Sequence, residues 1–198
     1  MNPLKRTSPL TIILSICVFF FFINISFAQT KKVIIIGIDG CRPDALKSAR
    51  TPNIDNLLKT AVYSLDALND RITSSGPAWS SMLTGVWWDK HGVNNNSFTN
   101  PKFSAYPPLF KYLEDFDSKL HTVSISQWHP INDHIAKNYA DKIINVQGAS
   151  TEVGDDATNY LKFQNPDLIF VHFDDVDGAG HGYGYSTTVS QYIAAIEK

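Results

Sequence analysis

The stretch VIIIGIDGCRPD, residues 33–44, decides the fold of this chain. The unbroken apolar run Val33–Ile38 is typical of a strand that is buried on both faces of a parallel sheet. Asp39 follows at once, and Gly40 leaves backbone room beside its carboxylate, where a metal ion or a phosphate can approach. The stretch therefore predicts a strand that carries a carboxylate to the ligand-binding edge of a sheet.

Further strands and helices follow in alternation. The apolar run Leu168–Phe173 predicts a second buried strand, and Leu120–Ser126 is a shorter, more alternating candidate. Helical spacing lies between them, in Ile54, Leu57 and Leu58, in Leu109, Leu113 and Phe116, and in Val153, Ala157, Tyr160 and Leu161. This alternation predicts an α/β fold, with a doubly wound, mostly parallel sheet and helices on both faces. Asp39 and Asp177 both come after strands, at the edge where ligands bind in such sheets.

The N-terminal residues 1–28 have the layout of a secretory signal peptide. Lys5 and Arg6 precede the apolar stretch Leu10–Ile25, which ends in the small-x-small sequence Ser26-Phe27-Ala28. The stretch is short for a membrane span and contains Ser15 and Asn24, so an uncleaved anchor is the weaker interpretation. We expect a secreted or periplasmic protein whose mature part, residues 29–198, is long enough for one domain.

Cysteine content and net charge limit the disulfides and the classes of binding partner to expect. After the signal segment Cys41 is the one remaining cysteine, which excludes an intrachain disulfide in the mature chain. The formal net charge is −2, with no basic block or stripe, so an obligate nucleic-acid polymer or anionic membrane is not expected. A small phosphoester or similar anionic substrate remains compatible with this composition.

Ser75 is the candidate nucleophile. Gly76 and Pro77 follow it, and Pro77 suits the first turn of a helix that continues through Met82. A hydroxyl at a helix N-terminus meets unpaired N–H groups and the positive end of the dipole, which favours an alkoxide or a phosphate oxygen. The alternative is that Thr73, Ser74 and Ser75 only cap the helix.

Asp177 and His181 are candidate metal ligands in DGAGH, a glycine-rich segment expected to fold back as a loop. A carboxylate with an imidazole suits zinc or a similar metal. The alternative is an ordinary turn after a strand. The neighbouring Asp174 and Asp175 are either supporting groups or, on the favoured interpretation, solvated loop charges.

Two further groups are weaker candidates. His129, Asp133 and His134 lie in one polar segment, which we interpret as a loop rather than a ligand set. Trp87, Trp88 and Trp128 have two interpretations, stacking on a base or aryl leaving group, or packing at a pocket rim.

Taken together, these segments resemble the alkaline phosphatase superfamily, and most closely its nucleotide pyrophosphatase/phosphodiesterase branch. The matching segments are DGCRPD, TPNIDNL, SGPAWSSMLTG, DKHGV and DVDGAGH, in the family's order and across nearly the whole mature chain. The resemblance implies two divalent metal ions, most simply Zn²⁺, with Asp39 and Ser75 on one and Asp177 and His181 on the other. It also implies that Ser75 attacks phosphorus and forms a phospho-serine intermediate, which water then hydrolyses.

Three departures from the family pattern stand out. The phosphodiesterase branch usually has Thr at the Ser75 position and Asn at the Ala78 position, which puts a nucleotide substrate in doubt. The sulfatase branch has Arg where Trp79 stands, so a sulfatase-like hydrolase is the lesser alternative. The family's remaining ligands, an Asp-His pair and a later His, lie downstream of the Asp177 motif and do not occur in this chain. The resemblance therefore implies that residues 29–198 are the N-terminal portion of an alkaline phosphatase-like hydrolase domain whose C-terminal part is missing.

The end of the sequence leads to an expectation about stability. Val189, Ile193 and Ile196 begin an amphipathic helix that ends at Lys198 without a following strand. We expect residues 29–198 alone to be inactive and poorly stable, with the apolar face of this helix uncovered. A catalytically silent fragment is therefore the alternative from a different class.

Overall fold

Within residues 31–198, the part of the chain that the computed structural model describes, four strands form one parallel sheet. The expected signal segment lies outside the described residues. The strands are β1 (Val33–Ile38), β2 (Thr122–Ser126), β3 (Lys142–Asn145) and β4 (Leu168–Phe173), in the order β1-β4-β2-β3. The three strands expected from the apolar runs are confirmed, and β3 is an addition, because KIIN is too short to give a periodicity signal.

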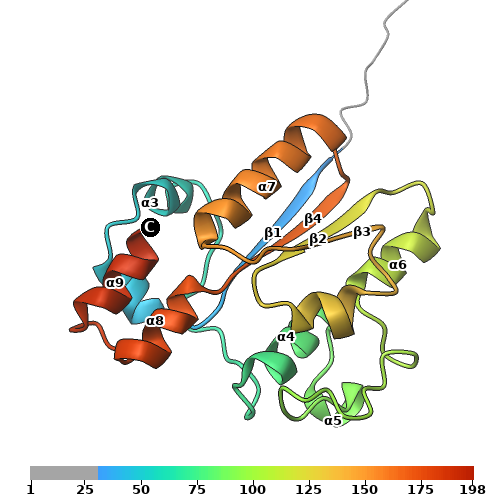
Figure 1. Cartoon of the computed structure of the whole chain (residues 1–198), viewed down its shortest axis with the longest axis horizontal. Coiled ribbons are helices and arrows are strands. Elements are labelled where there is room, and N and C mark those ends of the chain that lie inside the picture. Colours follow the sequence, from blue (N-terminus) through green and yellow to red (C-terminus); the bar gives the residue numbers. More distant parts are fainter. Residues whose placement is uncertain (1–30) are drawn as a thin grey trace, which may run out of the picture. The chain divides into compact units, whose positions relative to one another are not determined.

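Helices cover both faces of this sheet, as expected for a doubly wound fold (Figure 1). They are α2 (Pro43–Ser48), α3 (Pro52–Leu58), α4 (Ser75–Thr84), α5 (Trp88–His91), α6 (Leu109–Phe116), the π-helix η1 (Ile131–Ala136), α7 (Ser150–Gln164), α8 (Asp175–Tyr183) and α9 (Ser190–Glu197). Among the described residues, no helix is long and apolar enough to cross a membrane.

Two apolar cores lie on opposite faces of the sheet. On one face, Val153 and Ala157 of α7 pack against residues of β2 and β4 that include Val123 and Ile169. On the other face, residues of α4, α6 and η1 pack around Phe170 of β4. Successive strand residues point to opposite faces, so Ile169 and Phe170 serve different cores.

The register of the sheet places the ends of β1 and β4 side by side. Gly37 is paired with His172, and Ile38 with Phe173. The Asp39 N–H continues the ladder by donating to the Phe173 carbonyl at 2.9 Å. Asp39 and Asp174 therefore leave the sheet at the same edge, on neighbouring strands.

Two local expectations were wrong. The segment that contains Asp177 and His181 is the helix α8, whose N-terminal turn carries favourable acidic residues. The segment after Pro130 is not a loop, because Ile131 and Ile135 are buried in the core and hold it as the π-helix η1.

The expected exposure of the last helix was also wrong. Val189, Ile193 and Ile196 pack around a small core formed by Ala45 of α2, Val176 of α8 and Tyr192 of α9. This third core covers the apolar face of α9 without a following strand.

Candidate active site

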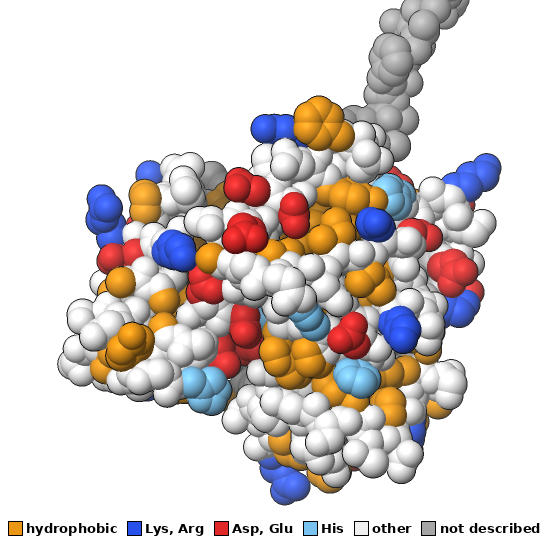
Figure 2. Space-filling view, viewed as in Figure 1, with side chains coloured by type: hydrophobic (Ala, Val, Ile, Leu, Met, Phe, Trp, Pro, Cys, Tyr) orange, Lys and Arg blue, Asp and Glu red, His pale blue; other side chains and the backbone are white. Residues whose placement is uncertain are grey.

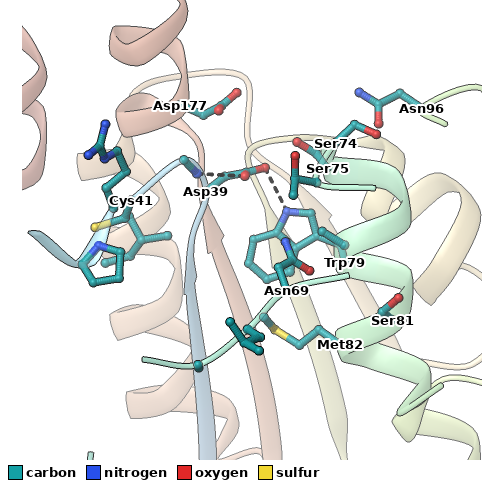
Figure 3. A pocket seen from close by; sticks show the side chains of 18 of the residues that line it. Asp39, Cys41, Asn69, Ser74, Ser75, Trp79, Ser81, Met82, Asn96 and Asp177 are labelled. Atoms are coloured by element: carbon teal, nitrogen blue, oxygen red, sulfur yellow. Dashed lines mark hydrogen bonds between the residues drawn. The ribbon is translucent and has the colours of Figure 1, made fainter. Parts of the chain in front are cut away.

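All four residues singled out from the sequence line one pocket of about 1080 Å³. Asp39 follows β1, Ser75 begins α4, and Asp177 and His181 belong to α8. In Figure 3, Asp39 and Ser75 point toward each other, and Asp177 lies on the far side of Asp39. Acidic side chains also gather along the middle of the face seen in Figure 2, which favours the approach of cations.

Hydrogen bonds hold the Asp39 carboxylate in place. Its Oδ1 accepts from the Gly40 N–H at 2.9 Å, and its Oδ2 accepts from Trp79 Nε1 at 2.9 Å. Burial would raise the pKa of Asp39, but interactions with His172, Trp79 and Ser75 outweigh it and lower the pKa below 3.8. Asp39 is therefore an anion at neutral pH.

Ser75 is the first residue of α4, and its hydroxyl is one of the groups that lower the pKa of the Asp39 carboxyl. The competing role of helix cap does not occur, because the residue at the N-cap, Ser74, makes no side-chain cap bond. Fewer unpaired N–H groups remain at this helix N-terminus than the sequence led us to expect. Gly76 donates its N–H to Asn96 Oδ1 at 2.7 Å, and Pro77 has no N–H to offer.

Asp177 and His181 lie four residues apart on α8, so they share one face of the helix. His181 Nε2 is 3.3 Å from Asp177 Oδ2, and three-quarters of the His181 side chain is exposed. Two ligands of a tetrahedral zinc ion with ~2.0–2.1 Å bonds have about this separation. The pair therefore fits a metal ion without rearrangement.

The loop after β1 brings this pair close to Asp39. Gly40 has a φ of +65°, and a Cβ atom there would lie 2.7 Å from Asp177 Oδ1. A glycine is required for both reasons, since other residues would be strained and would collide with Asp177. The two carboxylates consequently face one pocket from adjacent elements.

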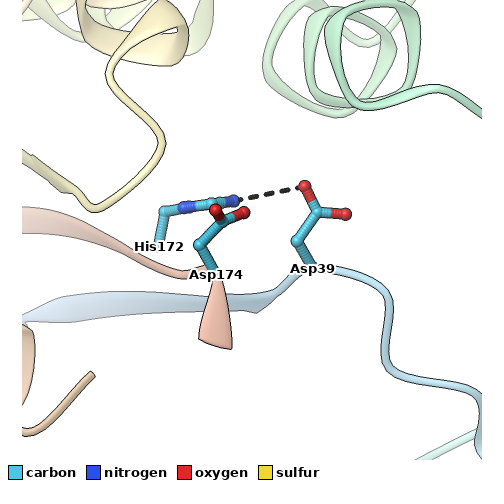
Figure 4. Close-up of side chains that lie close together, drawn as sticks. All are labelled: Asp39, His172 and Asp174. Carbon is cyan, nitrogen blue, oxygen red and sulfur yellow. Dashed lines mark ion pairs between the residues drawn. The ribbon is translucent and has the colours of Figure 1, made fainter. Parts of the chain in front are cut away.

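A second cluster of metal-ligating groups adjoins Asp39. Ligand atoms of Asp39, His172 and Asp174 all lie within 4.8 Å of one another (Figure 4). His172 Nε2 is fully buried and lies 3.5 Å from Asp39 Oδ2, too far for a well-formed hydrogen bond. Burial and the charges of nearby carboxylates raise the pKa of Asp174, with His172 partly opposing them. A cation would relieve the repulsion here, so the donor set of this edge fits divalent metal ions.

The polar segment with His129, Asp133 and His134 stays outside this pocket, as expected. His129 Nε2 lies 3.0 Å from the Val146 carbonyl, and His134 stacks on Phe98 at a centroid distance of 4.5 Å. Of the three tryptophans, Trp87 alone lines the pocket, and Trp128 packs near Phe98.

Three residues near the site had no signal in the sequence that we recognised. Asn96 lines the pocket from the loop 94–101, where its signal was only that of an exposed turn. His172 lies within an apolar strand, and a lone polar residue in such a run is a signal that could have found it. Trp79 was considered only for the arginine that it replaces, whereas its indole N–H binds Asp39.

Comparisons with known proteins show which families this chain is similar to. Residues 33–112 match the family model described as type I phosphodiesterase / nucleotide pyrophosphatase. A bovine protein, bis(5'-adenosyl)-triphosphatase ENPP4, is 25% identical over 183 residues, which cover 81% of this chain and 39% of the relative. Human ectonucleotide pyrophosphatase/phosphodiesterase family member 5 is 26% identical over 98 residues, 50% of this chain and 20% of the relative.

Solved structures share the fold. Murine ectonucleotide pyrophosphatase/phosphodiesterase 5 superposes with a TM-score of 0.64 and 19% identity, over 84% of this chain and 49% of that one. Phosphonoacetate hydrolase from Sinorhizobium meliloti gives a TM-score of 0.55 and 14% identity, over 85% of this chain and 51% of that one.

The chain thus spans well under half the length of the bovine relative and about half of the murine structure. The matched family segment begins at β1 and contains Asp39, Ser75 and Asn96. With its parallel sheet and the matching relatives, this chain is similar to the type I phosphodiesterase/nucleotide pyrophosphatase family of the alkaline phosphatase superfamily.

Proposed function

We propose that this chain carries the nucleophile and half of the metal-binding site of a phosphoester hydrolase that depends on two divalent ions, most simply Zn²⁺. One observation supports this most directly. The Ser75 hydroxyl, at the N-terminus of a helix, shares one pocket with the anionic Asp39 carboxylate, Asp177 and His181. A serine placed this way is activated by its surroundings rather than buried as a structural hydroxyl.

The four residues divide into two ligand pairs. Asp39 and Ser75 would hold one ion, and Asp177 and His181 would hold the other. When bound, such ions supply positive charge that lowers the pKa of the serine hydroxyl and stabilises charge on the phosphoryl and leaving oxygens. His172 and Asp174 lie behind Asp39 and add donor atoms to the same edge.

The residues of this chain position the substrate for attack. Ser75 Oγ loses its proton and forms a bond to phosphorus, while the bond from phosphorus to the leaving oxygen breaks and that oxygen gains a proton. The positive end of the α4 dipole favours the charge on the phosphoryl group. Asn96 accepts from Gly76 through Oδ1, which leaves its amide N–H₂ to donate to a phosphoryl oxygen. Water then cleaves the phospho-serine.

The pocket also has an apolar part, formed by Leu68, Met82 and Trp87. These side chains are exposed by 90%, 59% and 54% respectively, so they are available to a ligand. We infer that the leaving group has an apolar or aromatic face, as an aryl group or a nucleobase does.

Two serine-to-alanine variants test the assignment of Ser75 as the nucleophile. In a chain that also carries the downstream Asp-His pair and His, zinc-dependent release of nitrophenol from bis(p-nitrophenyl) phosphate should fall by roughly 10⁴-fold or more in Ser75→Ala, because the nucleophile is lost. The matched control is Ser80→Ala on the same helix, whose buried hydroxyl does not line the pocket and has no hydrogen-bond partner. It should keep wild-type activity.

Activity of Ser75→Ala equal to that of the wild type, or faster hydrolysis of an aryl sulfate than of both an aryl phosphodiester and an aryl phosphomonoester, would contradict the proposal. A wild-type chain that folds but shows no zinc-dependent turnover and no phosphorylation of Ser75 would support the alternative of a catalytically silent chain. Mass spectrometry after incubation with the phosphodiester measures that phosphorylation.

A further inference from the structure

Tyr185 lies two residues beyond α8 and binds one of the proposed metal ligands. Its hydroxyl donates to Asp177 Oδ1 at 2.5 Å and lies 3.2 Å from the Asp177 carbonyl. Its ring meets the His181 ring edge-on, with centroids 5.5 Å apart. One side chain thus contacts both members of the Asp177–His181 pair.

The position of the Tyr185 ring is determined by the residues around it. Its ring occupies the space where a Cβ atom of Gly180 would be, 2.1 Å from the nearest ring carbon. The Tyr185 carbonyl accepts from Arg42 Nη1 at 2.6 Å, and the Tyr185 ring meets the Tyr192 ring edge-on, with centroids 5.6 Å apart. Tyr192 in turn donates to the Gly40 carbonyl and accepts from the Arg42 N–H. Tyr185 therefore links α8 to the loop that follows Asp39.

We propose that Tyr185 is a positioning residue for metal binding, which holds Asp177 Oδ1 so that Oδ2 faces His181 Nε2. The inference rests on the proposed function, since it assigns a role toward the ion held by Asp177 and His181. A carboxylate on a short side chain rotates freely in water, and its rotation would carry Oδ2 away from the imidazole. The hydroxyl of Tyr185 removes this freedom before any ion arrives, so the pair needs less ordering on binding.

The test compares two variants with two matched controls in the same segment. Tyr185→Phe removes the hydroxyl and keeps the ring in place. Gly180→Ala keeps the hydroxyl but displaces the ring that carries it. Tyr183→Phe is the control for the first, because Tyr183 is 62% exposed. Gly178→Ala is the control for the second, because a Cβ atom at Gly178 would meet nothing within 4 Å.

Zinc affinity is measured by calorimetric titration, and the Co²⁺ absorption spectrum reports the ligand geometry. Thermal unfolding in excess EDTA shows whether each variant is folded without metal. We expect Tyr185→Phe and Gly180→Ala to bind zinc about 10- to 100-fold more weakly, with a changed Co²⁺ spectrum, as is usual when a group that orients a metal ligand is removed. Both controls should match the wild type.

Zinc binding by Tyr185→Phe that is as tight as in the wild type, or tighter, would overturn the role of Tyr185. If Tyr185→Phe is unfolded in EDTA, the zinc affinity of Gly180→Ala is compared with that of the wild type instead, and the same outcome would overturn the role of Tyr185. A wild-type chain that binds no zinc would contradict the proposed function, and the inference with it. Zinc binding by the wild type with no change in either variant would contradict the inference alone.

Discussion

Two adjacent serines of α4 differ in their hydrogen bonding. The Ser80 hydroxyl is fully buried and has no partner, whereas Ser81 Oγ lies 2.9 Å from His91 Nε2. His91 Nδ1 accepts from the Val93 N–H at 3.1 Å, so Nε2 carries the proton and donates to Ser81. Burial lowers the pKa of His91, which keeps the imidazole neutral.

Alanine at these two positions should therefore affect the free energy of unfolding differently. Ser81→Ala leaves a buried imidazole N–H without an acceptor and should lower the free energy of unfolding by about 1–3 kcal/mol. Ser80→Ala removes a hydroxyl that has no partner and should leave stability unchanged or slightly higher. Urea denaturation of the two variants measures the difference. Equal destabilisation by both would show that the Ser81–His91 bond does not contribute.

At the scale of elements, the packing of α4 on β1 depends on one glycine. A Cβ atom at Gly37 would lie 2.3 Å from the indole ring of Trp79. The same ring packs edge-on against Phe170 and His172 of β4, with centroids 5.8 and 4.8 Å away. Its N–H then reaches Asp39 at the end of β1. The close approach of helix and strand thus connects the core to the site.

Gly37→Ala should push the Trp79 ring off β1 and lower the free energy of unfolding by about 1–3 kcal/mol, the usual cost of overpacking. It should also weaken the Trp79–Asp39 bond. Gly154→Ala is the matched control, because a Cβ atom there meets nothing within 4 Å on the helix α7. We expect it to stabilise the protein by about 0.5–1 kcal/mol, since alanine has the better helix propensity.

Thermal unfolding of the two alanine variants measures both effects. The intrinsic fluorescence of the folded state gives a second measurement, which a displaced Trp79 should change in Gly37→Ala only. If Gly37→Ala were as stable as the wild type, the contact between Trp79 and β1 would not constrain α4.

At the scale of the whole described unit, the strand β1, rather than α9, carries exposed large apolar side chains. Val33, Ile34 and Ile36 are 49%, 50% and 62% exposed. Ile34 and Ile36 point to the sheet face that α7 covers over β2 and β4, but α7 does not extend across β1. Within residues 31–198, no strand pairs with the outer edge of β1. Such an edge is prone to association.

Ile36→Lys should therefore raise the highest concentration at which the chain is still monomeric, because a lysine on an exposed edge opposes strand pairing. Ile35→Lys is the matched control, since Ile35 points to the opposite face and packs against the core beside Phe170. That variant should lose its cooperative unfolding. Light scattering over a range of concentrations measures association. Equal scattering from Ile36→Lys and the wild type would show that the chain does not associate through the edge of β1.

Local patterns in the sequence predicted a large part of this protein. The apolar runs of β1 and β4 predicted a parallel sheet, because strands buried on both faces lack polar positions. The rule that ligands bind beyond the carboxyl ends of such strands then placed Asp39 and Asp177 at one edge, and Pro77 marked the start of the helix that carries Ser75. Each of these inferences needs only neighbouring residues and backbone chemistry.

By itself, then, the sequence determined the fold class and which carboxylates and hydroxyl meet. The tertiary structure alone decided how they are held. Packing across 40 residues places the Trp79 indole on Asp39, and the space at Gly180 admits the Tyr185 ring beside Asp177. It also decided that α9 is covered, since this depends on contacts with α2 and α8 that no local pattern encodes. Periodicity records which face of an element is apolar, whereas the partner of that face depends on the path of the whole chain.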